Sequence, residues 1–196
     1  MAGDEAGEGV EKLSRLNQVY LAIISRYKDY IQEKESISVA ELPTLVTPKS
    51  GAVAKKAAEI RGSFEPYSYE RNFYDAAAKA FSFVRDDIES AALPLEFWLS
   101  PEDTLTYKMG DVIDKNILLC SILVALGNPS AKVLVKMREN NINAFTYFEF
   151  NGRVYVLDIG NGIKEFDDKN AMVASLGIDE DTSVYEFNNQ TYVDIA

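Results

Sequence analysis

The most apolar stretch of the chain lies between Gly110 and Gly127 and predicts a buried central helix. Asp111 and Asp114 open this stretch, and the residues from Ile117 to Leu126 are almost all apolar. Such a run is too long for one strand, and its final glycine suits the left-handed position that follows a helix. We therefore expect a helix that is apolar, and hence buried, on nearly every side.

Helical spacing also marks the N-terminal part of the chain. Residues 1–9 are acidic and rich in Gly and Ala, and we expect a flexible tail there. From Val10 to Ile31 apolar residues recur every three or four positions, which predicts an amphipathic helix that packs on its own domain or on a partner helix. A connector with two prolines follows and should lie extended, so residues 10–66 form a helical segment with its connector.

Further helices are expected before the central one. An Ala- and Lys-rich stretch predicts a short helix over residues 52–60, and apolar residues at helical spacing predict a long one from Phe73 to Ile88. Ser100 is suited to cap a short helix that begins at Pro101, because a serine oxygen can accept from the free N–H groups of the first turn.

Beyond Gly127 the pattern changes to alternation, which predicts antiparallel strands. Strands are expected at 132–137, 143–150, 153–159, 163–166, 184–187 and 191–195, with a short helix over 169–176. Asn151-Gly152 is a strong hairpin signal, and Ala144, Thr146 and Phe148 should share one face of their strand. Helices followed by antiparallel strands indicate an α+β domain over residues 67–196.

Composition narrows the possible functions. The chain has 196 residues, a formal net charge of −11 and no histidine. Nucleic acid is an unlikely partner for so acidic a protein, since binding to it depends on Lys and Arg neutralising phosphates. The absence of histidine removes the usual general base and the commonest metal ligand. We see no signal peptide and no membrane-spanning stretch, so we expect a cytoplasmic protein that does not bind membranes.

The sequence FWLSPEDTL at 97–105 is followed by GDVID at 110–114, by an apolar helix that ends in ALG, and by NAFTYFEFNGRVYVLD at 143–158. Together these motifs resemble the transglutaminase-like group of papain-related cysteine hydrolases. The resemblance covers about Tyr69 to Asp168. It implies an α+β fold in which N-terminal helices and a buried central helix pack against an antiparallel sheet.

The resemblance also implies where catalytic residues would stand, and two of the three are replaced. The family places its cysteine in the motif G-D-C-x-D, where this chain has Val112, and its histidine in a triplet such as H-A-F, where this chain has Asn143. Asp158 keeps the place of the acid. Valine cannot form a thioacyl bond, and an asparagine amide does not transfer protons near neutral pH. Cys120, roughly 12 Å further along the helix, should be a buried thiol without a catalytic role.

We therefore predict a pseudoenzyme, with no catalytic residues and no cofactor or metal, that serves as a protein-binding or scaffolding module. The vestigial cleft would be lined by Trp98, Asp111, Val112, Asn143, Phe145 and Asp158. Two alternatives stay open. One is a hydrolase that uses carboxylates, with or without a metal ion, and the other is a regulatory subunit that docks through its N-terminal helix.

The hydrolase would need Asp111, Asp114 and Asp158 to converge. The simpler interpretation is that Asp111 and Asp114 cap the central helix and that Asp158 ends a strand.

Overall fold

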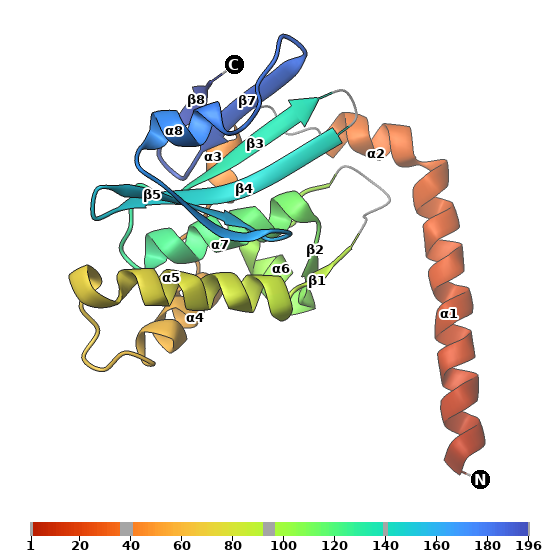
Figure 1. Cartoon of the computed structure of the whole chain (residues 1–196). Coiled ribbons are helices and arrows are strands. Elements are labelled where there is room, and N and C mark those ends of the chain that lie inside the picture. Colours follow the sequence, from red (N-terminus) through yellow and green to blue (C-terminus); the bar gives the residue numbers. More distant parts are fainter. Residues whose placement is uncertain (1, 36–40, 92–96, 139–140, 196) are drawn as a thin grey trace. The chain divides into compact units, whose positions relative to one another are not determined.

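A computed structural model describes residues 2–35, 41–91, 97–138 and 141–195, which form two compact units. The smaller unit contains α1 (Ala2–Arg26) and α2 (Lys28–Glu35), and the larger unit contains all the other elements (Figure 1). Helix α1 begins at Ala2, so the residues expected to form a flexible tail are helical. The alanines and acidic residues there favour this, because they suit the first turns of a helix.

The helices of the larger unit largely follow the sequence pattern. They are α3 (Leu42–Leu45), α4 (Gly51–Arg61), α5 (Tyr69–Asp86), α6 (Pro101–Tyr107) and α7 (Val112–Ala125). Helix α3 forms within the connector that was expected to lie extended, because its proline sits at the start of the helix, where no N–H is needed. Residues 36–40 of the connector and the pair Leu93-Pro94 lie outside the described residues.

Six antiparallel strands form the main sheet in the order β6-β5-β4-β3-β7-β8. Their bounds are β3 (Lys132–Arg138), β4 (Asn141–Phe150), β5 (Arg153–Asp158), β6 (Gly162–Phe166), β7 (Thr182–Phe187) and β8 (Tyr192–Asp194). The predicted hairpin is present, with Asn151 and Gly152 both at positive φ as its turn requires. A short parallel pair, β1 (Glu89–Ser90) with β2 (Met109–Gly110), lies apart from this sheet and was not predicted.

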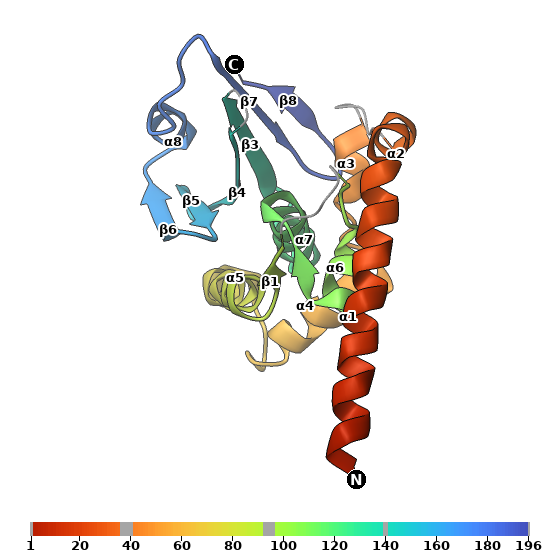
Figure 2. The same cartoon turned by 90° about the vertical axis from the view of Figure 1, so that its right-hand side faces the viewer.

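Helices cover both faces of the sheet, but unequally (Figures 1 and 2). On one face, Ala144, Phe148 and Leu157 belong to the core that α4, α5 and α7 share with the strands. On the other face the short helix α8 (Lys169–Ala174) packs through Met172 on a smaller apolar cluster that includes Tyr147. The expected α+β class with a central helix against an antiparallel sheet is thus confirmed.

Helix α7 is the centre of the larger core, as the apolar run predicts. Every side chain from Ile113 to Leu123 is buried. Ser121 is a buried polar residue in the apolar part of the helix, and its hydroxyl donates to the carbonyl of Ile117 at 2.8 Å and accepts from the backbone N–H of Thr47 at 3.1 Å. This pair of bonds fixes the connector before α4 against the middle of α7.

A buried ionic cluster stabilises the α8 side of the sheet. The carboxylate of Glu186 accepts from Lys132 at 2.5 Å, from Lys169 at 2.7 Å and from the hydroxyl of Tyr147 at 2.6 Å. Burial alone would raise the pKa of Glu186, but these three hydrogen bonds lower it on balance. Lys169 is the first residue of α8, so the cluster attaches that helix to β3, β4 and β7.

Candidate functional site

Two aspartates organise the N-terminus of α7. The side chain of Asp111 accepts from the backbone N–H groups of Ile113 at 2.7 Å and Asp114 at 2.9 Å. The side chain of Asp114 accepts in return from the N–H of Asp111 at 2.9 Å and also from that of Leu99 at 2.8 Å. This reciprocal capping box satisfies helix N–H groups that have no partner within the helix. It also ties the segment of Trp98 and Leu99 to the start of α7.

Asp114 is fully buried in this arrangement. Burial, with the charge of Asp111 as a smaller cause, raises the pKa of Asp114 to about 6, although hydrogen bonds from the backbone of Asp111 and Leu99 lower it. The close packing requires a glycine beside it, because a Cβ atom on Gly110 would lie 2.9 Å from the Cβ atom of Asp114. The buried side chain of Asp114 therefore serves to cap the N-terminus of α7.

Val112, the first residue of α7, is 40% exposed, although the helix is buried from the next residue onwards. Its carbonyl oxygen accepts from the side-chain amide of Asn116 at 2.8 Å, and the same nitrogen donates to the carbonyl of Ala144 at 3.1 Å. Asn116 thus connects the start of α7 to β4 at the residue next to Asn143.

The side chains of Asn143 and Asp158 point to the other face of the sheet. Successive strand residues alternate between faces, and Ala144 and Thr146 face α7, so Asn143 and Phe145 face α8. Asp158 shares this second face, where its carboxylate accepts from the backbone N–H groups of Gly160 at 2.9 Å and Asn161 at 3.1 Å. The amide of Asn161 donates to the remaining oxygen at 2.8 Å.

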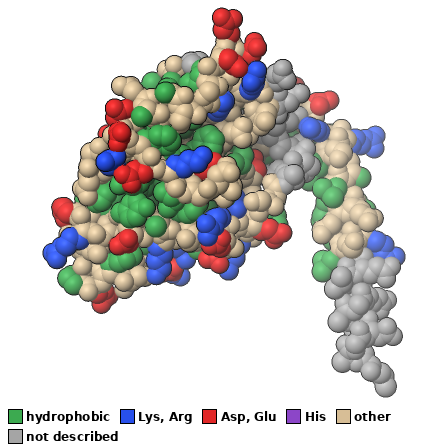
Figure 3. Space-filling view, in the orientation of Figure 1, with side chains coloured by type: hydrophobic (Ala, Val, Ile, Leu, Met, Phe, Trp, Pro, Cys, Tyr) green, Lys and Arg blue, Asp and Glu red, His purple; other side chains and the backbone are tan. Residues whose placement is uncertain are grey.

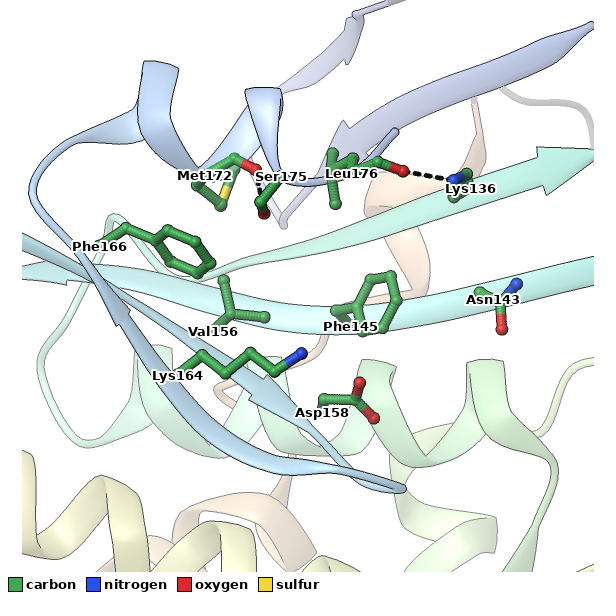
Figure 4. Close-up of a pocket in the computed structure, with 10 residues that line it drawn as sticks. All are labelled: Lys136, Asn143, Phe145, Val156, Asp158, Lys164, Phe166, Met172, Ser175 and Leu176. Atoms are coloured by element: carbon green, nitrogen blue, oxygen red, sulfur yellow. Dashed lines mark hydrogen bonds between the residues drawn. The ribbon is translucent and has the colours of Figure 1, made fainter. Parts of the chain in front are cut away.

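The six residues expected to line one cleft consequently fall into two groups. Asn143, Phe145 and Asp158 line a cavity of about 180 Å³ between the sheet and α8 (Figure 4). Trp98, Asp111 and Val112 lie at the start of α7 and are not among the residues that line this cavity. Asn116 joins the carbonyl of Val112 to that of Ala144, and the side chain of Asn143 extends from the opposite face of β4.

The carboxylates of the alternative hydrolase are not assembled into a site. Asp111 and Asp114 are engaged in the capping box, and Asp158 closes the turn between β5 and β6. The described residues contain no group of three or more Cys, Asp or Glu side chains arranged to hold a metal ion. The geometry of these three carboxylates therefore gives the hydrolase no specific support.

The thiol of Cys120 is fully buried and donates to the carbonyl of Ala131 at 3.5 Å. Burial raises the pKa of this thiol, which disfavours the thiolate that a nucleophile needs. Neither Asn116 nor Lys164 was among the expected site residues. The sequence could have indicated Asn116, because a polar side chain in so apolar a run needs buried hydrogen-bond partners. It could not have indicated Lys164, because the cavity beside that residue depends on the order of the strands in the sheet.

Comparisons with known proteins agree with this architecture. No protein-family description and no curated protein sequence matches the chain. Among solved structures, Legionella pneumophila LapG is similar, with 19% identity, a TM-score of 0.53 and coverage of 81% of this chain and 88% of that one. Its EGTA-treated form gives 18% identity, a TM-score of 0.51 and coverage of 82% and 87%.

A third structure, a candidate cysteine protease from Cytophaga hutchinsonii, is 15% identical with a TM-score of 0.46, over 84% of this chain and 58% of that one. At these low identities the comparisons show similarity of fold alone, and the evidence for that similarity is the two LapG structures. The chain has the papain-like, transglutaminase-like fold.

Proposed function

We propose that this protein is a binding module on the papain-like fold that has lost cysteine–histidine catalysis, and that it binds a protein through the surface around Val112. The observation that carries the proposal is the exposed valine at the N-terminus of an otherwise buried helix. In the family that the sequence resembles, the nucleophilic cysteine stands at this position. An apolar side chain there supports contact with a partner and cannot supply covalent chemistry.

Other exposed apolar residues support a binding surface in this region. Met109 is 37% exposed three residues before Val112, and Ile142 is 39% exposed on β4, two residues before the carbonyl that Asn116 joins to α7. Burial of Val112, Met109 and Ile142 against a partner would stabilise the complex by about 25 cal/mol for each Å² of apolar surface removed from water. The net charge of −11 favours a protein with a basic or neutral face as the partner.

The experiment compares two valines of equal exposure. Val112 is 40% exposed and Val193, on the edge strand β8, is 42% exposed. The tagged full chain, its Val112→Glu variant and its Val193→Glu variant are used to capture proteins from native cell extract, and a captured protein is then purified and titrated calorimetrically. We expect Val112→Glu to weaken that binding at least about tenfold, while Val193→Glu leaves it unchanged.

Thermal unfolding of both variants controls for folding, since both positions are exposed. Equal binding by Val112→Glu and the unchanged chain would contradict the assignment of the surface. A second result would contradict the loss of catalysis. It is that the purified chain cleaves or transamidates peptide amides, and that the Val112→Glu variant keeps this activity.

A further inference from the structure

The cavity beside α8 has the size of a small-molecule site. It measures about 180 Å³ and is bounded by β3 to β6 on one side and by α8 and the residues that follow it on the other. An engineered protein cavity of about 150 Å³ admits one benzene molecule. Figure 3 shows an apolar area on this face of the sheet, with cationic side chains beside it.

The apolar wall of the cavity suits a ring or a short branched chain. Phe145, Val156 and Phe166 line it from the sheet, and Met172 borders it on the α8 side (Figure 4). Aromatic rings and a methionine sulfur make favourable contacts with another ring, because both are polarisable and the rings prefer offset or edge packing. Val156 and Met172 are buried, so this part of the wall is fixed by the fold.

The polar side of the cavity carries two lysines, Lys136 and Lys164, and one aspartate, Asp158. The ammonium group of Lys136 donates to the carbonyls of Leu176 and Gly177, and Asp158 accepts bonds on both of its oxygens. In the described part of the chain, no hydrogen bond or ion pair involves the side chain of Lys164. Figure 4 shows its amino group directed towards Phe145 and Asp158, within the cavity.

We infer that this cavity binds a small free monocarboxylate whose apolar body is about the size of one ring. Lys164 binds the carboxylate through a charge-assisted hydrogen bond. Lys136 and Lys164 exceed Asp158 by one positive charge, which matches a single negative charge. A dianion such as phosphate is disfavoured by Asp158 and by the charge of the whole protein. This site lies apart from the Val112 surface and does not depend on the proposed protein binding.

The test titrates the ¹⁵N-labelled full chain with phenylacetate and with the uncharged phenylacetamide. We expect saturable shifts of the amide signals of Phe145, Val156 and Phe166, with phenylacetate bound more tightly. Lys164→Met keeps the apolar stem and removes the charge, and should weaken phenylacetate binding at least about fivefold while leaving phenylacetamide unchanged. The matched control is Lys55→Met on α4, which lowers the net charge equally and should have no effect.

Three outcomes would overturn the inference. They are the absence of saturable shifts at the cavity, equal binding of acid and amide, and equal binding by Lys164→Met and the unchanged chain. A peptide with a C-terminal phenylalanine carboxylate distinguishes a chain end from a free acid. Weaker binding of that peptide than of phenylacetate supports the free acid, and tighter binding assigns the cavity to a peptide end instead.

Discussion

The hydroxyl group of Thr146 shares its one proton between both oxygens of Asn116, the backbone carbonyl at 3.1 Å and the side-chain carbonyl at 2.9 Å. Both residues are fully buried, so water cannot replace these bonds. Asn116 passes the connection on by donating to the carbonyls of Val112 and Ala144. These contacts fix the start of α7 on β4 and thereby decide which face of the strand meets the helix.

Thr146→Val should destabilise the fold, because it keeps the shape of the side chain and leaves the amide oxygen of Asn116 buried without a donor. We expect a loss of roughly 1–3 kcal/mol in the free energy of unfolding, measured by urea denaturation. The control is Thr106→Val on the exposed face of α6, where the expected change is within about 0.5 kcal/mol. Equal effects of the two variants would show that the Asn116 contact does not stabilise the fold.

Local signals in the sequence predicted most of the elements. Ser100 caps α6 as expected, accepting from the N–H of Asp103 at 3.1 Å. Asn151-Gly152 likewise forms the predicted turn. Both features depend on residues a few positions apart, so the sequence contains them directly. The place of β7 beside β3 is different, since it pairs Val135 with Tyr185, which lie 50 positions apart in the chain. Alternation alone cannot specify a partner strand.

The candidate site was only partly predictable for the same reason. Alternation along β4 separates Asn143 from Ala144 and Thr146, but it does not say which face α7 covers. The hydrogen bonds of Asn116 decide that, and they bring together residues about 30 positions apart. The resemblance to cysteine hydrolases suggested one cleft, and alternation along β4 turns the side chain of Asn143 away from the face that Ala144 and α7 share.

The buried carboxyl group of Asp114 predicts a pH effect that Asp114→Asn should reveal. Its pKa is about 6 in the folded chain, above the ordinary value of 3.8, so the folded state holds the proton more tightly than the unfolded state does. The stability from this group is fully present below about pH 4 and is lost as the pH rises through 6.

Relative to the Asp114→Asn variant, the unchanged chain should therefore lose roughly 2 kcal/mol of unfolding free energy between pH 4 and 6.5. Urea denaturation of both proteins across this range measures the difference between their unfolding free energies. The other carboxylates are present in both proteins, so their contributions cancel in this difference. Above pH 7 the difference should stay constant. A difference that is flat between pH 4 and 6.5 would contradict the raised pKa.

Removal of residues 1–36 should leave the larger unit folded. The residues in both of its apolar clusters begin at Leu42, so this deletion removes none of them. We expect a cooperative melting transition like that of the full chain. A longer deletion through Pro48 also removes the buried Leu42 and Val46, and should cost roughly 3 kcal/mol or more. Unfolding after the shorter deletion would show that α1 is part of the core.

The same shorter deletion tests whether the N-terminal helix mediates association. If α1 docks on a partner, a complex captured by the full chain should be lost from the shortened chain while its melting transition persists. If α1 is dispensable for association, both chains should capture the same proteins, and the Val112 surface would then account for binding alone.

Val112→Cys tests whether the N-terminus of α7 would activate a cysteine at this position as a nucleophile. The first turn of α7 lies at the positive end of the helix dipole, which favours a thiolate. The thiol should titrate below the ordinary pKa of about 8.5, and about one unit below a thiol introduced by Ser82→Cys in the C-terminal part of α5. Alkylation rates between pH 5 and 10 measure both, and the buried Cys120 should not react in the folded chain.

Adding Asn143→His to Val112→Cys tests the division of the site. In papain-like enzymes a neighbouring histidine lowers the thiol pKa by several units. Because the side chain of Asn143 extends from the face of β4 opposite α7, the second substitution should shift the alkylation midpoint by less than about half a unit. A larger drop would show that residue 143 reaches the thiol around the end of the strand, and that one cleft joins the two groups of residues after all.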